Sequence, residues 1–392
     1  MTDDVLAEET VVPLDPVHEG EPLLSVRDLR VRFPTDDGVV NAVDGVGYDV
    51  YPNEVLGIVG ESGSGKSVSS LAIMGLLPKS AIIDGEIVFR GQDLLHMREA
   101  ERRALRGGRL AMVFQDALAA LNPVFTVGDQ IEEAIASHQP KIGKQAKRKR
   151  AIELLDLVGI PNPQTRVDQF PHEFSGGMRQ RAMIAMSISN DPDVLIADEP
   201  TTALDVTIQA QVLEVLERIQ ERTSSAIILI THDLGVVAGV ADRVLVMYAG
   251  RPVEMGSVDE IFYASRQPYT LGLLASLPRL DAGDKTGRLY RIKGQPPSLI
   301  FVPSGCPFHP RCDFAQLPEP CATERPELRI VEHAYATHQT ACHFAETLTE
   351  GTLAELHAEV GAELEVVEDA AAIGTAEAAA VEALSTPADG GA

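Results

Sequence analysis

A short apolar run that ends at a glycine constrains the fold of this chain more than any other feature. Residues 55–59 read VLGIV, and residues 67–77 have the apolar spacing of a helix that stops at Pro78. Between them lies the glycine-rich loop GESGSGKS. The residues of this loop are Gly60, Glu61, Ser62, Gly63, Ser64, Gly65, Lys66 and Ser67. A buried parallel strand, such a loop and a helix in this order predict an α/β fold built around a phosphate loop.

The residue types of the loop suit a nucleoside triphosphate with magnesium. Glycines let backbone N–H groups converge on phosphate oxygens, and the N-terminus of the following helix adds a favourable dipole. Lys66 is expected to reach the β- and γ-phosphates, and the Ser67 hydroxyl to ligate Mg²⁺. The plain alternative, a glycine-rich turn with a chance lysine, leaves the strand and the helix on its two sides unexplained.

A second apolar strand, residues 194–197, ends in two acids. Asp198 suits the Mg²⁺ shell, either directly or through water. Glu199 suits polarisation of the attacking water, as a general base or as an orienting group. An acid pair at a strand end is ordinary when it stands alone. In a chain that also carries a phosphate loop, the pair indicates an enzyme that hydrolyses ATP.

The segment FSGGMRQR, residues 174–181, separates this chain from other phosphate-loop proteins. Ser175 has the position of a helix N-cap, and Gly176 and Gly177 open a helix that continues to residue 188. This segment resembles the signature motif of ATP-binding-cassette (ABC) proteins. In that family the signature of one subunit closes over the nucleotide held by the other, so the resemblance implies that these three residues bind nucleotide in a shared site.

Four single residues resemble family positions with known roles. Gln115, after a predicted strand at residues 110–114, resembles the glutamine that senses Mg²⁺ and the attacking water. Asp205 resembles the acid of the loop that crosses the dimer interface, and His232 resembles the histidine that contacts the γ-phosphate. Phe33 ends the first predicted strand; it either stacks on adenine or belongs to the core. The resemblance thus implies three catalytic residues: Glu199, His232 and Gln115.

Further segments narrow the branch of the family. Residues 115–123, QDALAALNP, resemble the same stretch in ATPases of oligopeptide, dipeptide and nickel importers, and residues 268–270 resemble the start of their C-terminal extension. Met178 replaces the usual glutamine of the signature, as in the peptide-importing branch. The resemblance covers residues 23–344. It implies an ATP-hydrolysing subunit that energises uptake of di- or oligopeptides, with nickel or another small solute as the alternative cargo.

All four cysteines lie close together in the sequence: Cys306, Cys312, Cys321 and Cys342. Such a local cluster in a chain that begins without a signal-peptide pattern favours metal binding over disulfides. The spacing lacks the paired C-x2-C of a zinc ribbon, and four thiolates can equally hold an iron–sulfur cluster. The resemblance implies a [4Fe–4S] cluster, and Zn²⁺ or free thiols remain the alternatives.

The charge of the chain is concentrated at its ends. The net charge is −25, and residues 1–20 and 345–392 together supply 17 of the negative charges without any Lys or Arg. We expect both tails to be disordered. The body between them is not basic enough to predict nucleic acid as a ligand. A basic run at residues 141–150 indicates a solvated helix face or a contact with anionic lipid or an acidic partner.

The expected organisation follows from these patterns. The predicted fold is a phosphate-loop α/β ABC domain with a helical subdomain and a small C-terminal cysteine-rich lobe. The expected parts are an acidic N-terminus (1–22), the ABC domain (23–265) with its helical subdomain (about 116–181), an extension with the four-cysteine site (266–344) and an acidic tail (345–392).

The resemblance also implies partners and a location. The partners are a second ABC ATPase subunit, expected to be a distinct paralogue, two membrane-spanning permease subunits and an extracellular substrate-binding protein. No apolar run of this sequence approaches the ~18 residues of a membrane span. The expected location is therefore the cytoplasmic face of the cell membrane. The rival functions are a soluble ABC ATPase acting on DNA or ribosomes and an iron–sulfur regulator without turnover.

Overall fold

The computed structural model describes residues 20–348 apart from 117–119, 203–204, 278–289 and 332–336. The tails expected to be disordered therefore lie outside the described residues, except at their inner ends. Ala345 and Leu348 are buried, so the packed part of the chain continues past the expected boundary at residue 344.

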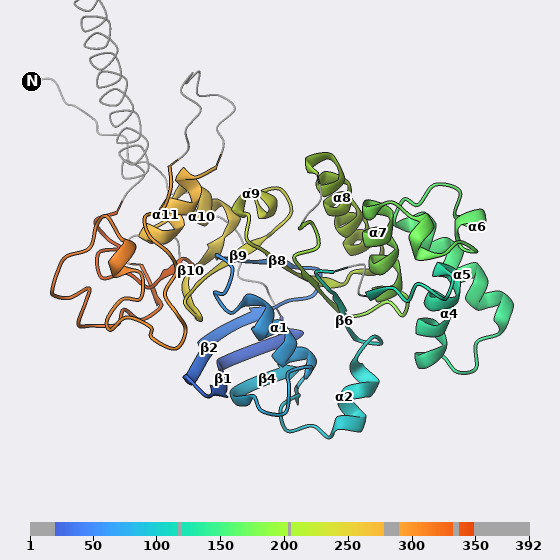
Figure 1. Cartoon of the computed structure of the whole chain (residues 1–392), viewed down its shortest axis with the longest axis horizontal. Coiled ribbons are helices and arrows are strands. Elements are labelled where there is room, and N and C mark those ends of the chain that lie inside the picture. The colour runs from blue at the N-terminus through green and yellow to red at the C-terminus, as the bar shows by residue number, and fades with distance from the viewer. Residues whose placement is uncertain (1–19, 117–119, 203–204, 278–289, 332–336, 349–392) are drawn as a thin grey trace, which may run out of the picture.

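Buried parallel strands form the middle of the main sheet, whose strand order is β11-β12-β10-β9-β3-β8-β7-β6 (Figure 1). The parallel strands are β3 (Val55–Val59), β6 (Leu110–Val113), β7 (Val194–Asp198), β8 (Ala226–Thr231) and β9 (Arg243–Tyr248). Their side chains are almost all buried because both faces of the sheet are covered. This burial on both faces explains why these strands are continuous apolar runs in the sequence.

An antiparallel extension lengthens the sheet beyond β9. Strand β10 (Arg251–Ser257) pairs with β9, and β12 (Gln339–Thr340) pairs with β10 and with β11 (Arg329–Ile330). We call residues 290–331 and 337–348 the C-terminal segment. The sequence predicted this part as an appended lobe, but two of its strands continue the main sheet, because β10 leaves an edge that further strands can pair with.

A second, antiparallel sheet lies against one face of the main sheet together with helix α1 (Lys66–Met74). Its strand order is β2-β1-β4-β5. The strands are β1 (Leu24–Thr35), β2 (Gly38–Val50), β4 (Ile82–Phe89) and β5 (Gln92–Asp93). Ile73 of α1, Val31 of β1 and Ile58 of β3 belong to one buried apolar cluster, which joins the two sheets around α1.

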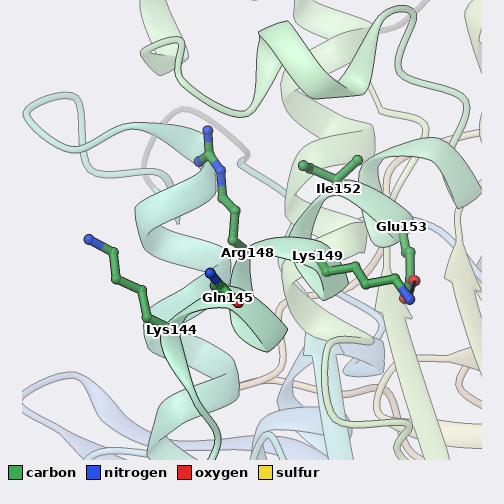
Figure 2. Close-up of a pocket in the computed structure, with 6 residues that line it drawn as sticks. All are labelled: Lys144, Gln145, Arg148, Lys149, Ile152 and Glu153. Carbon is green, nitrogen blue, oxygen red and sulfur yellow. Dashed lines mark ion pairs between the residues drawn. The ribbon is translucent and has the colours of Figure 1, made fainter.

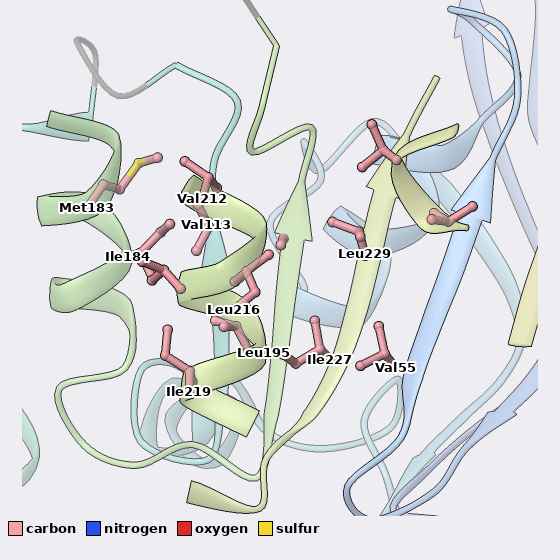
Figure 3. Packing of buried hydrophobic residues seen from close by; sticks show 14 of the residues in the cluster. Val55, Val113, Met183, Ile184, Leu195, Val212, Leu216, Ile219, Ile227 and Leu229 are labelled. Carbon is pink, nitrogen blue, oxygen red and sulfur yellow. The ribbon is translucent and has the colours of Figure 1, made fainter. Parts of the chain in front are cut away.

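Helices α7 (Gly176–Ser187) and α8 (Val206–Thr223) cover the opposite face. Figure 3 shows Val212, Leu216 and Ile219 of α8 beside the strand residues Leu195 and Ile227. The apolar side chains of α8 recur at helical spacing, so one face of the helix is buried and the rest is polar.

The remaining helices follow the predicted pattern in part. Residues 116–181, where helices were expected, contain in their described part α4 (Val127–His138), α5 (Lys144–Leu157), α6 (Pro163–Arg166) and the first half of α7. Short helices not predicted from the sequence are α2 (Glu99–Leu105), α9 (Leu234–Val237), α10 (Val258–Tyr263) and α11 (Pro268–Ala275). Over the described ranges, the helices are too short or too polar to cross a membrane.

Candidate functional site

The phosphate loop lies at the carboxyl edge of the main sheet, between β3 and α1. The neighbouring strands β8, β7 and β6 run parallel to β3, so the residues that follow them arrive at the same edge. These residues are His232, Glu199 and Gln115. Together with the loop they line a pocket of about 490 Å³. The structure thus brings together candidates that are up to 171 positions apart in the sequence, from Glu61 to His232.

The loop backbone explains why glycine occupies two of its positions. Gly65 caps α1 with φ +99°, and a Cβ atom there would lie 2.3 Å from the Ala42 carbonyl oxygen. At Gly60 a Cβ would lie 2.2 Å from the Met247 carbonyl oxygen. Any larger residue would have to push the loop away from the strands beneath it. No side chain caps the first turn of α1, so its N–H groups are available to an anion.

Lys66 is held inside the loop. Its Nζ donates to the carbonyl oxygens of Gly60 (2.6 Å) and Glu61 (3.0 Å). Burial lowers the pKa of its ammonium group, and the nearby carboxylates of Glu199 and Asp198 oppose that shift. The lysine is therefore positioned in the middle of the loop, where its charge faces the pocket.

Ser67 and Asp198, the two residues predicted to hold Mg²⁺, lie in direct contact. The Ser67 hydroxyl donates to Asp198 Oδ1 at 2.9 Å, which joins the first turn of α1 to the end of β7. Burial raises the pKa of the Asp198 carboxyl, and this hydrogen bond works in the opposite direction. A hydroxyl and a carboxylate beside phosphate-binding N–H groups are the oxygen ligands that Mg²⁺ prefers.

Glu199 is held by its neighbours on several sides. Its Oε2 accepts hydrogen bonds from Gln115 Nε2 (3.1 Å) and Thr202 Oγ1 (2.7 Å), and His232 Nδ1 lies 3.5 Å away. Its backbone has φ +47°, which is uncommon outside glycine, and its N–H donates to the Ile230 carbonyl oxygen. This strained turn aims the carboxylate into the pocket. Thr202 was missed from the sequence because a threonine three residues after an acid carries no distinctive signal.

The signature residues lie on a different surface. Ser175 caps α7, as expected, by accepting a hydrogen bond from the Met178 N–H. Asp205 caps α8 by accepting one from the Ile208 N–H, and Ile208 packs where a Cβ on Gly177 would sit. The starts of α7 and α8 thus lie in contact, which brings the signature close to Asp205. Ser175, Gly176 and Asp205 do not line the pocket of the phosphate loop.

Phe33 is half-buried and packs against the apolar cluster around α1. It is not among the residues that line the pocket of the phosphate loop. The structure therefore places its ring on the core, which was the second of the two roles considered from the sequence, and an adenine contact stays a prediction.

The four cysteines converge although they span 37 positions of the sequence. All four are free and line one enclosed pocket, together with Phe308, Phe314, Phe344, His309 and His343. Burial raises the pKa of the Cys312 and Cys342 thiols to about 12 and raises that of Cys306 as well. Within the described chain, no three His, Cys, Asp or Glu side chains are close enough to hold a single metal ion.

Most of the basic run lies in α5, where three of its six basic residues form ion pairs. Arg148 pairs with Asp168, Arg150 with Asp191, and Lys149 with Glu153. Figure 2 shows the side chains of Lys149 and Glu153 meeting. Both residues line an open hollow of about 520 Å³ on this helix. These pairs agree with a solvated helix face.

Two family models match separate parts of the chain. Residues 43–202 match the ABC transporter family, and residues 253–321 match the C-terminal region of oligopeptide/dipeptide transporters. Among solved structures, the dimeric ADP- and phosphate-bound ATP-binding cassette MJ0796 aligns with a TM-score of 0.54 at 23% identity, covering 60% of this chain and 98% of that one. This structural likeness concerns the fold alone.

Curated relatives extend the match beyond the core. The chain is 52% identical over 336 residues to the oligopeptide transport ATP-binding protein OppD of Mycobacterium tuberculosis, covering 86% of this chain but only 54% of that protein. It therefore spans about half the length of the mycobacterial relative. It is 55% identical over 294 residues to the dipeptide transport ATP-binding protein DppD of Bacillus subtilis, covering 74% of this chain and 87% of that protein. The chain belongs to the ABC transporter family, in the branch of oligopeptide and dipeptide transport ATP-binding proteins.

Proposed function

We propose that this chain binds and hydrolyses ATP to energise the uptake of di- or oligopeptides across the cytoplasmic membrane. The observation that carries the proposal is the convergence of Lys66, the Ser67–Asp198 pair and Glu199 at one edge of the sheet. The names of the curated relatives and the match at residues 253–321 favour peptides over nickel as the cargo.

The residues around the pocket of the phosphate loop have different roles in the proposed hydrolysis. The N–H groups of the loop and the Lys66 ammonium would bind the β- and γ-phosphates, and Ser67 and Asp198 would hold Mg²⁺. Magnesium, when bound, neutralises charge that develops on the phosphate oxygens. Glu199 polarises the attacking water, and the bonds from Gln115 and Thr202 keep its carboxylate aimed at that position.

A second ATPase subunit completes the site in this proposal. Ser175, Gly176 and Asp205 lie away from the pocket of their own chain, and Val206 beside Asp205 is 84% exposed. An uncovered helix N-terminus and an exposed apolar side chain both suit contact with another subunit. The solved relative MJ0796 is described as dimeric. We expect the second subunit here to be a distinct paralogue.

Contact with the two permeases would place the chain at the cytoplasmic face of the membrane. Large apolar side chains are exposed on the stretch that contains Gln115: Phe114, Val124 and Phe125. Exposed apolar groups beside a catalytic glutamine suit a surface that transmits closure of the ATP site to membrane subunits. An extracellular binding protein would deliver the peptide.

The cysteine pocket is proposed to hold a [4Fe–4S] cluster. Its donors are four thiols in an apolar enclosure, and soft thiolates are the ligands of iron–sulfur clusters. The four thiols line one pocket, although among the described residues no three His, Cys, Asp or Glu side chains are placed to hold a metal ion. A structural Zn²⁺ site is the alternative.

Transport in proteoliposomes tests the main proposal. Vesicles that contain this chain, its second ATPase subunit and the two permeases should accumulate labelled oligopeptide when ATP and the binding protein are supplied. Vesicles that carry Lys66→Ala should not. Uptake of nickel without uptake of peptide would show that nickel, the alternative cargo, is the transported solute. ATP hydrolysis by a chain that never associates with the permeases would overturn the transport function.

A further inference from the structure

An arginine between two of the cysteines contacts the phosphate loop. Arg311 immediately precedes Cys312, and its side chain is only 5% exposed. Its Nη1 lies 2.6 Å from Glu61 Oε2, and its Nη2 lies 2.9 Å from Glu61 Oε1. Glu61 is the second residue of the phosphate loop. The contact is therefore a bidentate ion pair between the C-terminal segment and the nucleotide site, and such paired bonds fix orientation as well as distance.

The guanidinium is itself held by the C-terminal segment and by Tyr248 of β9. Its Nε donates to the Lys293 carbonyl oxygen at 2.9 Å, and Nη1 is 3.3 Å from the Tyr248 hydroxyl. Its carbon lies 5.7 Å from the centre of the Tyr248 ring and 5.9 Å from that of Phe308. These contacts favour one orientation of the guanidinium, so the position of Glu61 depends on how the segment around Arg311 is folded.

The backbone of Glu61 is tied to the same region. Its N–H donates to the Tyr269 hydroxyl at 2.8 Å, and the rings of Tyr269, Tyr248 and Phe308 pack against each other with centres 4.7 to 5.4 Å apart. The carbonyl oxygen of Glu61 accepts a bond from Lys66 Nζ. A shift of Glu61 would therefore move an acceptor of the lysine and the N–H groups that follow it in the loop.

We propose that Arg311 is a positioning residue for the phosphate loop. Through Glu61 it holds the loop in the conformation that binds nucleotide, and it thereby makes ATP affinity depend on the fold of the cysteine-bearing segment. The inference rests on the proposed ATP binding but not on which metal, if any, the cysteines hold. An ion pair that merely anchors the segment to the core would stabilise the fold without altering affinity.

A double-mutant cycle in the assembled transporter distinguishes the two roles. Arg311→Gln and Glu61→Gln should each raise the KM for MgATP about tenfold, the size expected when a charged hydrogen-bonded partner is lost, with kcat changed by less than about twofold. The double variant should be no worse than either single one, because all three lack the same contact. Arg311→Lys, which keeps the charge but not the paired bonds, should fall in between.

The matched control is Arg325→Gln, which removes another arginine of the C-terminal segment, 3.2 Å from Asp44, and should leave the KM unchanged. The dissociation constant of a non-hydrolysable ATP analogue, measured by direct binding to the full chain, should rise in the same variants as the KM. Should Arg311→Gln fail to fold, Glu61→Gln and Arg311→Lys report on the same contact. An unchanged KM in a folded variant, or effects that add in the double variant, would overturn the proposal. Absence of ATP hydrolysis in the unaltered transporter would instead contradict the proposed function.

Discussion

At the scale of single residues, the proposed mechanism of hydrolysis depends on how one carboxylate is held. Glu199 leaves β7 in a left-handed backbone conformation, and side chains from three other positions surround its Oε2 atom. Such a group can orient water only while its neighbours keep it in place. Binding of phosphate is proposed to depend on other atoms, namely those of the loop and Lys66. Affinity and turnover should therefore respond to different substitutions.

Glu199→Gln should reduce ATP turnover at least about a hundredfold, because it removes the charge that polarises water while leaving the phosphate contacts intact. ATP affinity should be retained, and the closed, ATP-bound dimer should accumulate. Steady-state hydrolysis and nucleotide binding by the assembled transporter measure both effects. Lys66→Ala is the comparison and should weaken binding itself. A Glu199→Gln protein that keeps most of its turnover would exclude this role for the carboxylate.

At the scale of elements, the N-terminus of helix α7 does not line the pocket of the phosphate loop in its own chain, and we propose that it binds the nucleotide of a second subunit. Its N-cap Ser175 satisfies the Met178 N–H, while nothing lies within 4 Å of a Cβ placed on Gly176. The N-terminus of α1 has the same character and belongs to the pocket of the phosphate loop. Two such helix ends in one chain, facing different surroundings, are what a head-to-tail dimer requires.

Ser175→Arg should empty the composite site whose phosphate loop belongs to the second subunit, because a bulky side chain fills the space of the γ-phosphate. Nucleotide occupancy of both sites in a structure of the mutant complex measures this. The control is Ser257→Ala, which removes the N-cap of α10 at a similar cost of about 1 kcal/mol and should leave both sites occupied. Loss confined to the site that contains Lys66 of the same chain would contradict the head-to-tail arrangement.

At the scale of the whole molecule, the C-terminal segment joins three parts of the structure. Strand β12 pairs with β10 of the main sheet, Arg311 pairs with the phosphate loop, and the cysteines converge on a pocket beside the start of α11. The segment contains little regular secondary structure. A metal centre would therefore supply much of its folding free energy.

Anaerobically purified full-length protein should contain about four iron and four sulfide per chain, as a cluster with four thiolate ligands requires. Cys312→Ser should lose the iron and increase hydrogen exchange in residues 290–348, while the ATP core stays folded. Ser304→Ala in the same segment should keep the iron. Elemental analysis and hydrogen exchange provide the measurements. One zinc without sulfide would replace the cluster by a zinc site, and the absence of any metal would remove the cofactor.

The sequence by itself determined the elements whose signal is local. The apolar run of β3 predicts that strand at its observed bounds, and the residue types from Gly60 to Ser67 are enough to indicate a loop that binds phosphate. Both features can be recognised locally, because a parallel strand buried on both faces has a continuous apolar sequence and the residues of a phosphate loop are contiguous. The short strands β5, β11 and β12 were not predicted, since two residues are too few to display a period of two.

Only the tertiary structure decided which distant groups meet. Arg311 and Glu61 are 250 positions apart, and neither pattern nor composition marks an arginine beside a cysteine as a partner of the phosphate loop. Thr202 acquires its role from the turn that brings its hydroxyl to Glu199. The expected lobe is joined to the main sheet through the short strands β12 and β11, because β10 presents an open edge. Contacts of this kind depend on how the sheet and its helices pack, which local sequence periods do not encode.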